Sequence, residues 1–60
     1  MKESRSEEIL KMAILMEKRG KAFYEQVAKN TDNEEVANIF NIMAKEEQTH
    51  IEYLSEQFKY

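Results

Sequence analysis

Three side chains that can bind a metal interrupt the apolar rows of this sequence. Glu17 occupies a core position in the first half of the chain, and Glu47 and His50 occupy core positions in the second half. Burying a carboxylate without a partner is costly, so such a group should be paired, protonated or bound to a metal. Carboxylate oxygens and imidazole nitrogens suit iron, manganese and zinc. The pattern therefore predicts a metal site.

Each of the three residues also has an ordinary explanation. Glu17 alone fits a boundary residue whose carboxylate reaches solvent. Glu47 follows Lys45 and Glu46 and fits a solvated charged run. His50 alone fits a histidine at the rim of a core. The metal interpretation depends on the three residues meeting in space, which the surrounding elements must bring about.

The composition favours an all-α protein. Proline is absent, Gly20 is the one glycine, and the chain is rich in strong helix formers. A polar run at 30–33 predicts a loop. We expect one domain, 1–60, with helices at about 5–29 and 33–58. Thr31 with Glu34, or Asp32 with Glu35, offers a capping box for the second helix.

A short loop predicts that the two helices pack as an antiparallel hairpin. Glu17 lies about 14 residues before the turn and Glu47 about 15 after it, so at 1.5 Å per residue both stand roughly 21–23 Å from the turn. His50 lies one helical turn further, on the same side as Glu47. The hairpin should therefore hold Glu17 and Glu47 level with each other.

The apolar rows are wider than one helix–helix contact requires, and a chain of 60 residues is marginal by itself. A second copy, related by two-fold symmetry, is the simplest cover and gives a four-helix bundle. Larger even-numbered assemblies remain open. The side chains that one hairpin cannot cover together are Met16, Phe23, Phe40, Ile42 and Phe58.

Dimerisation would double the ligand set to four carboxylates and two imidazoles. Ferritin-like di-iron and di-manganese bundles use one Glu from each of two helices and a Glu-x-x-His motif from each of the other two. This chain supplies Glu17 and the motif Glu47-Gln48-Thr49-His50. The small residues Ala13 and Gly20, near Glu17, leave room at the site. We therefore expect two iron ions per dimer, with manganese or zinc as alternatives.

Two segments resemble the first half of a rubrerythrin-type ferritin-like domain. They are AILMEKRGKAFYEQVA at 13–28 and EVANIFNIMAKEEQTHIEYL at 35–54. The shared pattern is a Glu, a Phe-Tyr pair six and seven residues later, and then Met-Ala-x-x-Glu-x-x-His. The resemblance implies Glu17, Glu47 and His50 as metal ligands. It also implies that Tyr24 hydrogen-bonds a ligand carboxylate, while packing is the alternative role for its ring.

Rubrerythrins carry two such helix pairs in one chain, and this sequence carries one. It also lacks the cysteine-rich rubredoxin-like module, since it has no cysteine. In this respect the sequence is more similar to the encapsulated ferritins, in which two-helix chains build the di-iron site between subunits. That similarity implies a homodimer and an encapsulating protein shell as a possible partner.

The resemblance implies an oxidoreductase, either a ferroxidase or an enzyme that reduces peroxide or O2. The alternatives are a non-catalytic helical dimerisation module and an iron carrier without turnover. A net charge of −3 argues against nucleic acid as a partner. No apolar run is long enough to span a membrane, and the charged start at 1–8 lacks the core of a signal peptide. A cytoplasmic location is therefore expected.

Overall fold

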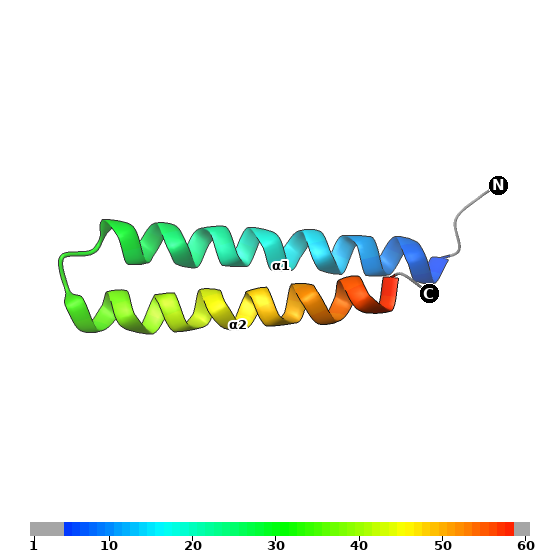
Figure 1. The fold of residues 1–60 in the computed structure, drawn as a ribbon. Helices are drawn as coiled ribbons and strands as arrows, with labels where there is room; N and C mark the ends of the chain where they lie inside the picture. The colour runs from blue at the N-terminus through cyan, green and yellow to red at the C-terminus, as the bar shows by residue number, and fades with distance from the viewer. Residues whose placement is uncertain (1–4, 59–60) are drawn as a thin grey trace.

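The computed structural model describes residues 5–58 and consists there of two helices, α1 (Arg5–Asn30) and α2 (Glu34–Phe58). They lie side by side and run in opposite directions, joined by the short loop 31–33 (Figure 1). The molecule measures about 50 Å along the helices and 15 by 10 Å across them. The all-α, two-helix hairpin predicted from the sequence is confirmed.

The loop is held by hydrogen bonds from its own polar residues. The backbone N–H of Thr31 donates to the carbonyl of Val27 at 3.1 Å, which closes the last turn of α1. The hydroxyl of Thr31 then accepts from the N–H of Asn33 at 3.2 Å. The side-chain oxygen of Asn33 accepts from the N–H of Val36 at 3.0 Å, so Asn33 caps α2. The predicted capping boxes were therefore wrong: the cap is Asn33, and not Thr31 or Asp32, since the hydroxyl of Thr31 accepts from Asn33 within the loop.

One stripe of each helix forms the contact between them. Only Ala44 and Ile51 are buried among the described residues, at 4% and 7% exposure. Around them lies a layer of half-buried side chains at steps of three and four, the spacing of one helical face. On α1 these include Leu10, Ala13, Glu17, Gly20, Tyr24 and Val27, and on α2 Val36, Phe40, Met43, Glu47, Gln48 and Leu54.

Large apolar side chains remain outside this contact. Met16, Phe23 and Ile42 are exposed at 67%, 60% and 57%, and Phe58 at 37%, whereas Phe40 is half-buried. Others on α1 are Ile9, Met12 and Leu15, and on α2 Ile39 and Tyr53. Neither helix in the described part of the chain has an apolar stretch long enough to cross a membrane.

The capping geometry yields a first prediction. Replacing Asn33 with alanine removes the acceptor for the N–H of Val36, so the free energy of unfolding should fall by about 1 kcal/mol. Chemical denaturation followed by circular dichroism would measure this loss. Asn38→Ala is the matched control, because Asn38 is exposed inside α2 and alanine is the better helix former. Equal effects of the two substitutions would contradict the assignment of the cap.

Candidate metal centre

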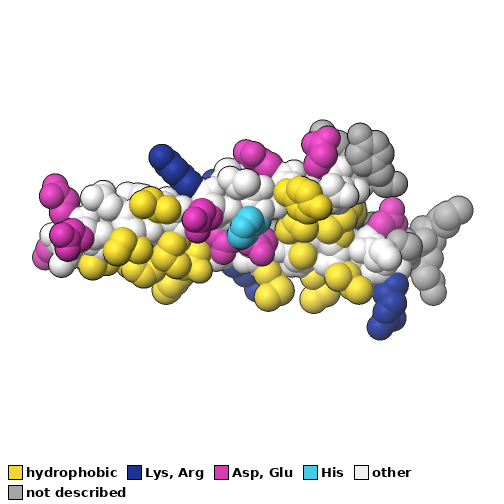
Figure 2. Space-filling model, turned by 90° about the horizontal axis from the view of Figure 1, so that it is seen from below, with side chains coloured by type: hydrophobic (Ala, Val, Ile, Leu, Met, Phe, Trp, Pro, Cys, Tyr) yellow, Lys and Arg dark blue, Asp and Glu magenta, His cyan; other side chains and the backbone are white. Residues whose placement is uncertain are grey.

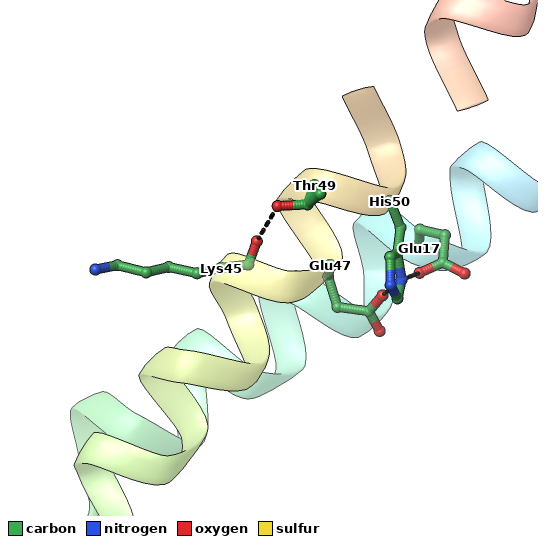
Figure 3. A network of polar contacts seen from close by, with 5 residues as sticks. All are labelled: Glu17, Lys45, Glu47, Thr49 and His50. Atoms are coloured by element: carbon green, nitrogen blue, oxygen red, sulfur yellow. Dashed lines mark hydrogen bonds and ion pairs between the residues drawn. The ribbon is translucent and has the colours of Figure 1, made fainter. Parts of the chain in front are cut away.

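Glu17, Glu47 and His50 meet halfway along the hairpin. The Nδ1 atom of His50 lies 3.3 Å from Oε1 of Glu17 and 3.1 Å from Oε1 of Glu47 (Figure 3). Glu47 and His50 share a face of α2 because they are three residues apart, and Glu17 reaches them from α1. The antiparallel register therefore brings together three side chains that are up to 33 residues apart in sequence.

The cluster lies at the edge of the helix–helix contact. The side chains of Glu47 and Glu17 are 17% and 31% exposed, and that of His50 is 59% exposed. The carboxylates are thus partly shielded by the two helices, while the imidazole faces outward. Figure 2 shows the histidine among acidic side chains on one face, with apolar side chains on either side of it along the hairpin.

The donor atoms of the cluster are close enough to bind one ion. One ligand atom from each of Glu17, Glu47 and His50 lies within 4.8 Å of the other two. Two carboxylate oxygens and one imidazole nitrogen suit iron, manganese or zinc, and no thiolate is present to favour a softer metal. The three residues therefore fit a metal, but as part of a ligand shell that is open on the side of His50.

The two carboxylates do not ionise independently. The pKa of Glu47 is raised, chiefly because the carboxylate of Glu17 lies next to it. The pKa of Glu17 is lowered, first by hydrogen bonding with Glu47 and then by hydrogen bonding with His50. Neighbouring carboxylates share their protons in this way because two adjacent negative charges repel each other. As the pH falls, we therefore expect Glu47 to be protonated before Glu17.

The pKa of His50 is raised, first by its hydrogen bond with Glu17 and then by that with Glu47. The charged imidazole therefore stabilises the fold below its ordinary pKa, and this contribution is lost as the pH rises through the raised value. A metal needs the neutral imidazole. Protons and metal ions should consequently compete for this cluster.

Tyr24 lies outside the cluster, within the helix–helix contact. Its ring centroid is 5.9 Å from that of Phe40 and 5.9 Å from that of Phe23. Among residues 5–58, its hydroxyl has no hydrogen bond to Glu17 or Glu47 within one hairpin. Its role toward a ligand carboxylate stays a prediction, and the observed contacts are those of packing.

A polar contact that the sequence did not suggest joins the helices on another side. The ammonium group of Lys21 donates to the side-chain oxygen of Gln48 at 2.7 Å, and the amide of Gln48 donates to Glu52 at 3.1 Å. Lys21 lies one turn nearer the loop than Glu17, whereas Gln48 directly follows Glu47. Lys21 and Gln48 lie at different distances from the loop, so the register of the hairpin does not predict their contact. The long lysine side chain spans the difference.

Residues 8–60 match the family described as Rubrerythrin. The matched segment contains both carboxylates and the histidine of the cluster. Comparison with curated proteins and with solved structures gave no significant match.

The contacts of His50 yield a prediction for protein prepared without metal. His50 is the one histidine of the sequence, so its NMR signals are unambiguous. Its pKa should lie above the ordinary value of about 6.5 and should fall toward that value in Glu17→Gln, which removes a negative charge. Glu46→Gln is the control, because Glu46 is exposed beside Glu47 but outside the cluster. An unshifted wild-type titration would contradict the geometry.

Proposed function

The chain belongs to the rubrerythrin family, and we propose that it is a di-iron carboxylate oxidoreductase whose site forms between two copies. The observation that carries this proposal is the cluster of Glu17, Glu47 and His50, with its ligand atoms within 4.8 Å of one another. The cluster corresponds to half of the ligand set of ferritin-like bundles, namely one lone Glu and one Glu-x-x-His motif. A second half is needed, and two-fold symmetry supplies it.

The exposed apolar side chains support the same dimer. A right-handed helix turns by about 100° per residue, so Met12, Met16 and Phe23 share one flank of α1. These three side chains are exposed at 63%, 67% and 60%. An apolar flank of this kind marks an interaction surface in a small protein. Because the cluster opens on the same side as apolar side chains (Figure 2), covering that side would also close the ligand shell.

In the proposed dimer, Glu17, Glu47 and His50 of both chains hold two iron ions, and manganese or zinc can take the same ligands. Bound iron would supply the electrons for reduction of O2 or peroxide. The chain's own contribution is to hold the carboxylates level, to orient the imidazole and to exclude water once the apolar flanks are covered. Enclosure of these dimers in a protein shell is the further assembly that the resemblance to encapsulated ferritins suggests.

A non-catalytic role is the second candidate, and the two contacts of His50 favour it. The hydrogen bonds from His50 to Glu17 and Glu47 partner all three groups within the hairpin. A polar cluster of this kind can fix the register of a helical dimer without binding metal. A dimerisation module would keep no metal and would be equally stable with a chelator. An iron carrier would bind the metal but show no reaction with O2 or peroxide.

Removal of a ligand tests the metal centre. Glu47→Ala should lower the affinity for Fe(II) at least on the order of 10–100-fold, the loss that altering even an outer partner of a ligand causes. It should also abolish O2-dependent oxidation of Fe(II) and peroxide reduction, whichever the wild-type protein performs. Metal analysis and stopped-flow absorbance would measure these effects.

The neighbouring Glu46→Ala is the matched control, because Glu46 is exposed and lies outside the cluster. Light scattering should show that both variants keep the wild-type mass. The oxidoreductase proposal fails if Glu47→Ala retains full activity, and the metal centre fails if wild-type protein binds no metal.

A charge on the apolar flank tests the dimer. Met16→Lys would place an ammonium group in the proposed interface, so the mass in solution should fall to that of one hairpin and the affinity for metal should fall with it. Leu15→Lys is the control, since Leu15 is turned by about 100° from Met16, away from α2 and from the flank. Light scattering with matched metal titrations would show the difference, and a dimeric Met16→Lys variant with intact metal affinity would refute this interface.

A further inference from the structure

Gly20 lies in the middle of α1, where glycine is a poor choice. Apart from proline, glycine is the residue least favourable to a helix interior, because it loses the most backbone conformational entropy when the chain folds. Its usual justification is a positive φ angle, and no glycine of the described chain has one. The backbone of α1 therefore accepts any L-residue except proline at this position, and the reason for glycine must lie in the space beside it.

That space is filled by one side chain. A methyl group on Gly20 would lie 2.8 Å from Oε2 of Glu47 and 3.6 Å from the carboxyl carbon of the same residue. No other described atom outside the adjoining part of α1 comes within 4 Å of it. The backbone of α2 is thus too distant to require glycine for close helix packing. The missing methyl group makes room for a carboxylate and for nothing else.

The two oxygens of Glu47 consequently have different neighbours. Oε1 lies 3.1 Å from Nδ1 of His50, while Oε2 occupies the place that a side chain at position 20 would take. Contacts below about 3 Å between a carbon and an oxygen do not persist, so a methyl group must displace the carboxylate. Displacement would carry Oε1 with it, because both oxygens belong to one rigid planar group.

We propose that Gly20 is a positioning residue that sets where the Glu47 carboxylate lies relative to Glu17 and His50. Its effect on metal binding rests on the proposed function of the cluster. Its effect on the position of Glu47 does not, because that follows from the space beside the helix. Glycine at position 20 thereby lowers the stability of the helix but allows the observed position of the Glu47 carboxylate. Replacing Gly20 should therefore raise the stability of the helix and lower the affinity for metal.

The experiment is Gly20→Ala. In protein without metal, the thermal midpoint should rise by a few degrees, because alanine favours the helix and the displaced carboxylate ends a flexible, partly exposed side chain. The affinity for Fe(II), titrated anaerobically, should fall about 10–100-fold, as for other changes that reorient a ligand. If Gly20 had only a structural role, its replacement would not raise the thermal midpoint and lower the affinity for Fe(II) at the same time.

Ala22→Gly is the matched control on the same helix. Ala22 is exposed, so this substitution should lower the thermal midpoint and leave the affinity for Fe(II) unchanged. It would show that helix stability by itself does not set metal affinity. A Gly20→Ala variant that is stabilised and binds Fe(II) like wild type would overturn the proposal.

A second measurement needs no metal. Gly20→Ala is compared in the wild-type and Glu47→Ala backgrounds, and the gain in thermal midpoint should be larger where the carboxylate is absent. Equal changes in both backgrounds would overturn the proposed contact, and so would destabilisation that persists without Glu47. If wild-type protein binds no Fe(II), the proposed function fails, while this comparison still decides whether Gly20 positions Glu47.

Discussion

Two packed helices share one line of contact, and this limit governs the rest of the molecule. A single line covers one stripe of each helix, and here it buries only Ala44 and Ile51 among the described residues. The hydrophobic stabilisation available within one hairpin is correspondingly small. The side chains of Met16 and Phe23 are exposed, and burying their apolar area would add to the stability of the fold. The chain therefore depends for its stability on what covers its open side.

The same limit explains why charged groups can occupy core positions. A carboxylate deep inside a bundle would need full compensation, whereas Glu17 and Glu47 lie at the edge of the contact with 31% and 17% of their side chains exposed. There His50 partners both of them, and the nearness of the Glu17 carboxylate raises the pKa of Glu47. The arrangement is tolerable in one hairpin, and it concentrates carboxylate oxygens where a cation could bind.

Regular geometry explains which features could be predicted from the sequence. The rise per residue places Glu17 and Glu47 level across the hairpin, and the i, i+3 spacing adds His50. Features that depend on side-chain conformation could not be predicted in this way. The sequence offered Thr31 and Asp32 as capping residues, whereas the cap is Asn33, because its side-chain oxygen is the one that accepts from the N–H of Val36. The pair Lys21 and Gln48 depends on the reach of a lysine. The sequence indicated room beside Gly20, but which side chain fills that room depends on the rotamer of Glu47.

Assembly and metal binding are linked if both use the open side of the hairpin. A ligand that binds the assembled form more tightly than the separate chains must shift the equilibrium toward assembly, and assembly must raise the affinity for that ligand by the same factor. Helix stability alone would favour alanine at position 20, and monomer solubility alone would favour polar residues at Met16 and Phe23. Each of these choices is locally unfavourable in one hairpin. All of them would become favourable together in the proposed dimer, where the apolar flanks would be buried and the carboxylates would share a cation, so selection for that assembled state would account for them with one cause.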